Sequence, residues 1–279
     1  MRTSMKLTTA ATLVFLSACS GGENASESNS QEALSAAINS EHRTEAYVER
    51  DNARHPLETL TFFEIQPDMT VVEIWPGGGW YTEILAPYLK DDGQFYAAHF
   101  DPNHEREYYS NSRANFEEKM AGSDVYSNVT ISTFVPGSDY EIAPAGSADR
   151  VLSFRNMHNW YMGGGEEGLN QAFQAFYTAL KPGGILGIVD HRLPEHRADS
   201  EMEGSGYMKA SWAIAFAEAA GFEFVGESDV NSNDLDSANY ERGVWTLPPT
   251  LALGETNRDL YIGIGESDRF TLKFRKPEE

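Results

Sequence analysis

The chain has 279 residues, of which 41% are hydrophobic, and this is enough to bury one sizeable core in a single domain. Its formal net charge of -22 at pH 7 argues against binding to nucleic acid, because phosphate recognition needs a positively charged surface. With one cysteine, the chain can form no disulfide within itself. We therefore expect one domain with a small-molecule ligand and no nucleic-acid partner.

The N-terminus has the pattern of a bacterial export signal. Two basic residues precede an apolar run at residues 7–16, which is too short to span a bilayer. The following Leu16-Ser17-Ala18-Cys19 resembles a lipoprotein processing box. We predict that residues 1–18 are a signal peptide, that Cys19 is lipidated, and that the lipid holds the protein at the cell envelope without a spanning helix. Ser20 is typical of outer-membrane sorting, with the protein facing the periplasm or the exterior.

Residues 19–40 are rich in Ser, Gly, Asn and Glu, and this composition predicts a flexible tether ahead of a folded domain at 41–279. Residues 41–52 favour a helix. Arg50, Arg54 and His55 lie just ahead of the first predicted strand. We interpret them as surface or packing residues, and the alternative is that they reach a ligand pocket.

The stretch from Val71 to Thr82 predicts how the domain begins. Val71-Val72-Glu73-Ile74 is typical of a buried strand, Gly77, Gly78 and Gly79 of a tight turn, and residues 80–89 have apolar side chains at helical spacing. Glycine has no Cβ, so backbone N–H groups in the turn and at the helix start can approach a ligand. The pattern indicates a Rossmann-like domain, and a turn without a ligand is the alternative.

Further strands are predicted at residues 93–101, 128–134, 148–154 and 184–190, with amphipathic segments between most of them. Strands that alternate with helices indicate an α/β fold with a doubly wound, mostly parallel sheet. In a nucleoside site, an acidic residue about 20 positions after the glycine turn binds the ribose. Here that position is His99, and Asp101 lies two residues further on.

Polar residues follow the strands at 148–154 and 184–190. Ligands bind outside the carboxyl ends of the strands in such a sheet, so His158 and His191 should both face the glycine turn. Histidine transfers protons near neutral pH, and we predict His158 and His191 as catalytic acid or base groups. A structural role for His158 is the alternative.

Three of the five tryptophans, Trp75, Trp80 and Trp160, fall in the same strand-end segments and predict an aromatic-lined pocket. The histidines and Asp101 come from separate strand ends without a tight ligand motif, so we predict no metal site. Residues 229–268 are interpreted as a long insertion before a last strand at 270–274, with a role in substrate specificity or, alternatively, disorder.

Taken together, these features resemble the class I methyltransferases that depend on S-adenosylmethionine, over about residues 60 to 228 and the last strand. The residues that carry the resemblance are Glu73-Ile74-Trp75-Pro76-Gly77-Gly78-Gly79, Ser138-Asp139, Gly146-Ser147-Ala148-Asp149-Arg150-Val151, Ala179-Leu180-Lys181-Pro182-Gly183-Gly184 and Ala219-Ala220-Gly221-Phe222. The phrase at 73–81 is similar to that of a group of exported bacterial predicted methyltransferases.

The resemblance implies a Rossmann-like sheet of seven strands with a final antiparallel strand and helices on both faces. It also implies that S-adenosylmethionine is the cofactor, with Asp139 accepting a hydrogen bond from the adenine amine. The implied cofactor-binding residues are Glu73, Trp75, Gly77, Gly78, Gly79, His99, Asp101, Asp139, Phe154 and Arg155.

Two positions depart from the family pattern. Trp75 stands where the family has its first glycine, and His99 stands where the ribose-binding acid is expected. The leading hypothesis is methyl transfer from S-adenosylmethionine to an unidentified small molecule. The alternative is a non-catalytic binding module that kept the fold and lost the cofactor, which the two departures favour, as does export away from the cytoplasm where the cofactor is made.

Overall fold

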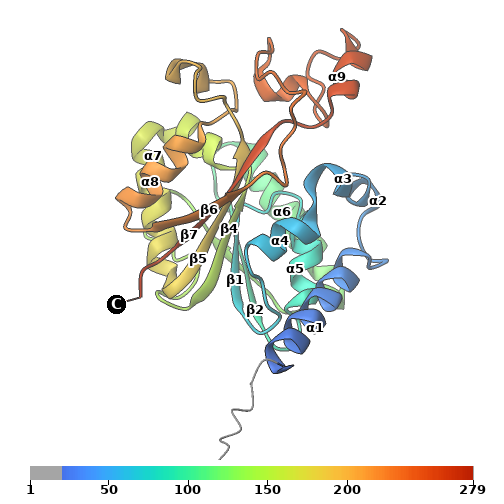
Figure 1. Cartoon of the computed structure of the whole chain (residues 1–279), viewed down its shortest axis with the longest axis vertical. Coiled ribbons are helices and arrows are strands. Elements are labelled where there is room, and N and C mark those ends of the chain that lie inside the picture. The colour runs from blue at the N-terminus through green and yellow to red at the C-terminus, as the bar shows by residue number, and fades with distance from the viewer. Residues whose placement is uncertain (1–20, 279) are drawn as a thin grey trace, which may run out of the picture.

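The computed structural model describes residues 21–278 (Figure 1). The predicted signal peptide and Cys19 lie outside this range. Seven strands form one sheet in the order β3-β2-β1-β4-β5-β7-β6. Only β7 runs antiparallel to its two neighbours. The strands are β1 (Thr70–Ile74), β2 (Gln94–His99), β3 (Val129–Thr133), β4 (Ala148–Phe154), β5 (Leu180–His191), β6 (Glu223–Ser228) and β7 (Arg269–Arg275).

The predicted fold class is confirmed, since the sheet is mostly parallel and the last strand is antiparallel. The central strands are buried almost throughout, as apolar runs in parallel sheets are when helices cover both faces. β1 pairs with β2 on one side and with β4 on the other. The carboxyl ends of β1, β4 and β5 therefore lie next to one another.

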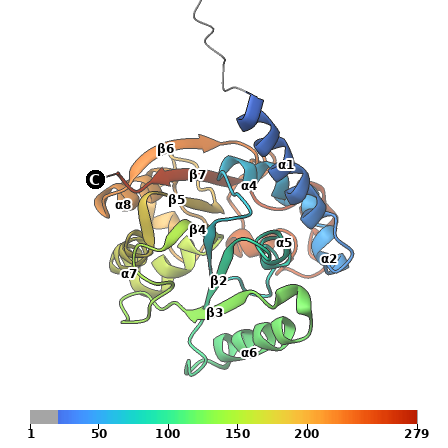
Figure 2. The same ribbon diagram turned by 90° about the horizontal axis from the view of Figure 1, so that it is seen from below.

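Helices cover both faces of the sheet (Figure 2). α7 and α8 pack against β4, β5, β6 and β7, whereas α1, α4 and α5 pack together on the opposite face. The helices are α1 (Gly21–Ile38), α2 (Glu45–Val48), α3 (Asp51–Arg54), α4 (Pro56–Phe62), α5 (Thr82–Tyr88), α6 (Glu107–Ala121), α7 (Met157–Ala179), α8 (Ala210–Ala219) and α9 (Arg258–Ile264), with short 3-10 helices η1 (Asp124–Tyr126), η2 (Asp199–Met202) and η3 (Gly243–Thr246).

The N-terminal segment differs from the prediction. Most of the expected tether at residues 19–40 forms α1, in which Leu34 and Ala37 are buried against the domain. Ser30 also hydrogen-bonds the Tyr88 hydroxyl at 2.8 Å. The tether prediction is therefore wrong for this part of the segment, because a few apolar side chains anchor a helix whose composition is mostly polar.

The predicted helix at 41–52 is also corrected, since the chain turns between two short helices, α2 and α3. Thr44 donates two hydrogen bonds to the Glu83 carboxylate, from its backbone N–H and its hydroxyl. Arg43 pairs with Asp51 at 2.7 Å. These contacts fold the segment against α5 and bring α3 over the strand ends.

The insertion at residues 229–268 contains η3 and α9 and lies above the carboxyl ends of the central strands (Figure 1). It leads directly into β7, whose antiparallel direction makes the strand begin at this edge of the sheet. Across residues 21–278, no helix is long and apolar enough to cross a membrane.

Candidate functional site

A cavity of about 340 Å³ lies at the carboxyl ends of β1, β4 and β5. It is lined by parts of the chain that are far apart in sequence: the segment of α2 and α3, the glycine turn, the start of α7 and the insertion. We call it the first cavity. Among its lining residues are Tyr47, Arg50, Arg54, Glu73, Trp75, Gly77, Gly78, Trp80, Tyr81, Phe154, Arg155, His158, His191, Trp245, Pro248 and Thr250.

The glycine turn forms one wall of this cavity. Gly77 has φ +59° with open space where a Cβ would stand, so its backbone is accessible to a ligand. At Gly78 a Cβ would lie 2.4 Å from the Tyr47 hydroxyl, which donates to the Gly78 carbonyl. The turn is thus held from outside by α2 and presents its backbone to the cavity.

Glu73 lines the first cavity as predicted, but most of its side chain is buried. The Thr82 hydroxyl donates to its carboxylate at 2.6 Å. Burial raises the pKa of Glu73 to about 7, against the lowering effects of this hydrogen bond and of the Lys119 charge. Glu73 can therefore accept or donate a hydrogen bond near neutral pH.

His99 does not line the first cavity, so its position does not support its predicted role in cofactor binding. Its side chain is fully buried, Nδ1 accepts from the Phe100 backbone N–H, and Nε2 donates to the Gly77 carbonyl at 3.1 Å. Burial lowers the pKa of His99 to about 4. The neutral ring supports the glycine turn from behind instead of binding a ribose.

Trp75 forms a partition at the end of β1. Its backbone has φ 45°, a conformation that favours glycine, and its indole Nε1 donates to the Phe134 carbonyl at 2.9 Å. The ring packs against Phe100, Phe134 and Trp160 at centroid distances of 4.8, 5.7 and 6.0 Å. The indole lines the first cavity on one side and another cavity on the other.

The cavity beyond Trp75, which we call the second cavity, has a volume of about 350 Å³. Asp101, Phe134 and Pro136 line it, together with Trp160 and the first turns of α7. Asp101 therefore lies in a position to contact a ligand. Asp139 is exposed and lines neither cavity, so its predicted contact with adenine is not supported by its position.

His158 and Asp190 form a buried pair in the wall of the first cavity. Asp190 accepts from the His158 ring Nδ1–H at 2.9 Å and from the His158 backbone N–H at 3.1 Å. It also accepts from the His191 backbone N–H. With Nδ1 engaged, Nε2 is the ring nitrogen left to accept a proton, and the structure shows no hydrogen bond from Nε2 to residues 21–278.

His191 lies beside His158, with ring centroids 5.2 Å apart, and its Nδ1 is 2.5 Å from the Ser267 hydroxyl. Burial and the neighbouring His158 lower the pKa of His191 well below its usual range. His158, Asp190 and His191 place one ligand atom each within 4.8 Å of one another, a grouping that could hold a metal ion. The sequence analysis weighed His99 and Asp101 for a metal site and predicted none, and these two residues lie outside this grouping.

Arg50 and Arg54 line the first cavity, where the sequence favoured surface or packing roles. Arg50 Nε donates to Glu266 at 2.6 Å, and Glu266 belongs to the insertion. Arg54 lies 4.6 Å above the Trp80 ring. Sequence reasoning missed Glu266 completely, and the only signal for the arginines was their place just before the first strand.

Phe154 and Arg155 line the first cavity, in agreement with their predicted position. Phe154 stacks on Tyr81 at 3.5 Å with an interplanar angle of 12°. The predicted aromatic wall is split: Trp75, Trp80 and Tyr81 line the first cavity, Trp160 lines the second, and Tyr161 packs against Trp212. Trp75 lines both cavities, whereas Trp80 and Trp160 each line only one of the two.

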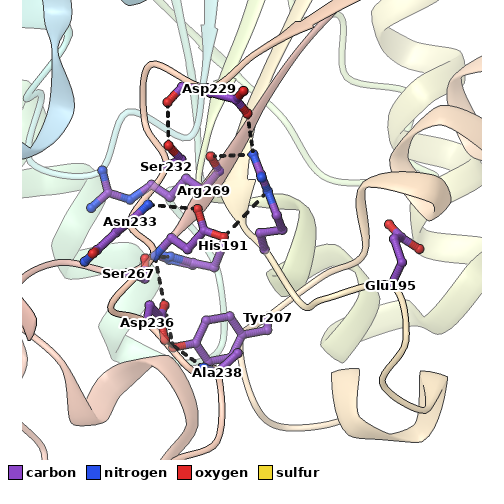
Figure 3. A network of polar contacts seen from close by, with 12 residues as sticks. His191, Glu195, Tyr207, Asp229, Ser232, Asn233, Asp236, Ala238, Ser267 and Arg269 are labelled. Carbon is purple, nitrogen blue, oxygen red and sulfur yellow. Dashed lines mark hydrogen bonds and ion pairs between the residues drawn. The ribbon is translucent and has the colours of Figure 1, made fainter.

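The insertion is fixed to the sheet by a polar network at its two ends (Figure 3). The Asp236 carboxylate accepts hydrogen bonds from the Tyr207 hydroxyl and from the Asp268 backbone N–H. The Asn233 backbone N–H donates to the Asp268 carboxylate. The Ser267 hydroxyl contacts His191. This network holds Trp245, Pro248 and Thr250 over the cavity, so the insertion is an ordered wall of the site.

No family model matches this sequence, and no curated protein sequence is significantly similar to it. Solved structures do share its fold. A SAM-dependent methyltransferase from Aquifex aeolicus has a TM-score of 0.53 and 16% identity, covering 82% of this chain and 93% of that one. A SAM-dependent methyltransferase from Methanosarcina mazei has a TM-score of 0.51 and 12% identity, covering 79% and 98%.

The [4+2]-cyclase SpnF also shares the fold, with a TM-score of 0.54, 17% identity and coverage of 81% of this chain and 82% of that one. These comparisons show that the chain has the fold of class I SAM-dependent methyltransferases. A cyclase with the same fold illustrates that function is decided by the site and not by the fold.

The residues present fit S-adenosylmethionine at its two ends. The glycine turn and Glu73 offer backbone and carboxyl groups in the first cavity, and Asp101 offers a carboxylate to hydroxyl groups in the second. The two cavities share Trp75, Phe100, Tyr109 and Asn159 as lining residues, so they are adjacent. Trp75 is the wall that a ligand spanning both would contact.

Proposed function

We propose that the protein binds S-adenosylmethionine across the two cavities and transfers its methyl group to a small-molecule acceptor. The observation that carries this proposal is the His158–Asp190 pair, whose His158 lines the same cavity as the glycine turn and Glu73 while Asp190 holds it from behind. The cofactor supplies an electrophilic methyl group on a sulfonium. The protein contributes alignment of the reactants and removal of a proton.

His158 serves as the general base in this proposal. The Asp190 carboxylate holds the Nδ1–H at 2.9 Å and fixes the ring by a second hydrogen bond to the His158 backbone. The neutral ring can then take a proton from the acceptor at Nε2, and Asp190 stabilises the imidazolium that forms. His191, which burial keeps neutral, lines the same wall and contacts the acceptor.

The glycine turn, Glu73 and Asp101 serve as the cofactor-binding groups. Gly77 leaves its backbone open to a ligand, and the buried Glu73 carboxyl is fixed by Thr82. Trp75 serves as an aromatic wall between the two halves of the cofactor site. The insertion closes the cavity with Trp245 and limits the size of the acceptor.

Isothermal titration of the purified protein with S-adenosylmethionine and with its demethylated product tests this proposal. We expect both to bind, and the tryptophan fluorescence of the protein to change when S-adenosylmethionine is added, with Trp75→Phe retaining affinity. If the native protein binds neither compound while Trp75→Gly gains affinity, the indole occupies the cofactor's own space. That result would favour the non-catalytic binding module instead.

We also propose that the protein is exported and held at the outer membrane by a lipid on Cys19, on the basis of the N-terminal pattern. Native protein should then partition with membranes and carry the mass of a lipid, and Cys19→Ser should remain unlipidated. A cleaved native form that is fully soluble and lacks the lipid mass would reject this proposal.

A further inference from the structure

Four guanidinium groups and the Glu266 carboxylate lie near one another beside the first cavity, and three of the guanidinium groups line it. Glu266 accepts hydrogen bonds from Arg50 and Arg269, and Arg54 Nε lies 3.8 Å from the same carboxylate. Burial opposes ionisation of Glu266, but the hydrogen bond from Arg50 and the charges of the arginines outweigh it and hold the pKa of Glu266 at about 2. Glu266 is thus ionised, and it balances only one of the four positive charges.

The fourth guanidinium belongs to Arg155, which follows β4 and lines the cavity. Burial, together with repulsion from Arg269 and Arg50, lowers the pKa of Arg155 to about 10, so it is still charged at neutral pH. The pKa of Arg54 is also lowered, with burial as the largest cause and the charge of Arg155 as the next. The positive charges of the four guanidinium groups therefore repel one another. We call Arg50, Arg54, Arg155 and Arg269 the arginine cluster.

Several donor atoms of the arginine cluster have no hydrogen-bond partner within residues 21–278. Arg54 is 2% exposed, and its Nε and Nη1 are both unpaired. Arg50 Nη2 and Arg269 Nε are buried and unpaired as well. Buried ionic donors without acceptors are costly. Arg50 and Arg54 line the first cavity, so their unpaired donors indicate a ligand there that supplies acceptors.

The chemistry of the missing acceptors follows from the donors. Guanidinium groups form paired, charge-assisted hydrogen bonds with the oxygens of carboxylates and phosphates. The protein as a whole has a formal net charge of -22, so this local excess of positive charge contrasts with the rest of its surface. The cofactor of the proposed function does not neutralise the excess, because its one carboxylate is outnumbered by its own ammonium and sulfonium.

We propose that the arginine cluster binds an acidic group, a carboxylate or a phosphate, of the small molecule that faces His158. If the anion is the methyl acceptor, which rests on the proposed function, the acceptor is a small organic anion. Arg155 and Arg54 contact the acidic group directly, and Glu266 holds Arg50 and Arg269 in place. His158 then meets a proton-bearing group elsewhere on the same molecule.

Titration of the purified protein with inorganic phosphate and with malonate, at low ionic strength, tests the proposal. The native protein should bind at least one of the two probes. Arg155→Gln should weaken that binding about 10- to 100-fold, the effect of losing a hydrogen bond to a charged group. The Arg155 side chain makes no hydrogen bond to a residue between 21 and 278, so its replacement removes no internal hydrogen bond.

Arg242→Gln is the matched control, since Arg242 is exposed, lines neither cavity and carries the same charge. It should bind the probes as the native protein does. The absence of binding to the native protein would overturn the proposal, as would equal weakening in Arg155→Gln and Arg242→Gln, which would indicate only a general charge effect.

A second titration separates this proposal from the proposed function. With S-adenosylmethionine at saturation, the probe should still bind, because the acceptor and the cofactor occupy the site together. Displacement of the probe would assign the cluster to the cofactor's own carboxylate and overturn the proposal. Binding of the probe by a protein that does not bind S-adenosylmethionine would support an anion site and refute methyl transfer.

Discussion

The two cavities on either side of Trp75 are similar in volume, about 340 and 350 Å³, but differ in chemistry. The first has three arginines, two histidines and the glycine turn in its walls. The second is lined mainly by aromatic rings, a proline and the glycines of α7, with Asp101 and Arg106 at its edge. The first cavity is thus rich in charged and titratable side chains, whereas the second is mainly aromatic.

This difference shows how a common fold is adapted at its strand ends. In both cavities, most of the walls come from segments that follow strands, and the segment of α2 and α3, which precedes β1, adds to the first. The polar side chains gather where α3, the start of α7 and the insertion meet, whereas the β2 and β3 ends contribute mostly apolar rings. The predictions below test whether the two cavities act as one site.

Removing the proposed base, His158, should have the largest effect. His158→Ala should lower kcat for methyl transfer about 10²- to 10⁴-fold, the usual contribution of a positioned general base. Release of the demethylated cofactor, measured over a panel of small organic acids, checks this. His196→Ala, an exposed residue that lines neither cavity, is the control, and a similar loss in both variants would remove His158 from the reaction.

Removing the partition should destabilise the protein and join the cavities. Trp75→Ala should cost about 3 kcal/mol of unfolding free energy, the low end for such a truncation because the indole is only partly buried. Trp75→Phe keeps the aromatic contacts and loses the hydrogen bond to Phe134, so it should cost about 1 kcal/mol. Denaturant unfolding measures both, and equal costs would mean that the indole does not hold the strand ends together.

The support behind the glycine turn should make stability depend on pH. The pKa of His99 falls from the 6.5 of an exposed histidine to about 4 in the folded protein. Between pH 6.5 and pH 4, only the unfolded chain takes up the His99 proton. The free energy of unfolding is therefore highest above pH 6.5 and falls by up to about 3 kcal/mol as the pH is lowered toward 4.

The variant His99→Gln should lack this slope, which can be measured as the difference in unfolding free energy from the native protein between pH 4 and 7. The comparison with a variant is needed because Glu73, whose pKa is raised to about 7, contributes in the opposite direction over an overlapping range. An unchanged slope in His99→Gln would show that another group causes the acid sensitivity.

The smallest effect should come from the Asp101 carboxylate of the second cavity. Asp101→Ala should weaken the binding of S-adenosylmethionine by about 1–2 kcal/mol, the effect of one lost hydrogen bond to a charged group. Asp139→Ala should leave the affinity unchanged, since Asp139 is exposed and lines neither cavity. The reverse result in calorimetry would restore the adenine contact that the sequence suggested for Asp139.

The sequence by itself determined the sheet, the glycine turn and the strand-end position of His158. These features depend on patterns within a few residues, such as apolar runs, glycines and helical spacing, and each predicted strand is present in the structure. The insertion before the last strand was also recognisable, because its composition interrupts those patterns.

Only the tertiary structure decided which polar residues share a site. Arg50 and Glu266 are 216 positions apart, and no local pattern links them. His99 and Asp139 match the family spacing, yet one is buried behind the turn and the other is exposed. The N-terminal segment folds as α1 because of a few apolar contacts with the domain. Charge pairing and burial depend on which segments meet in space, and spacing along the chain does not record that.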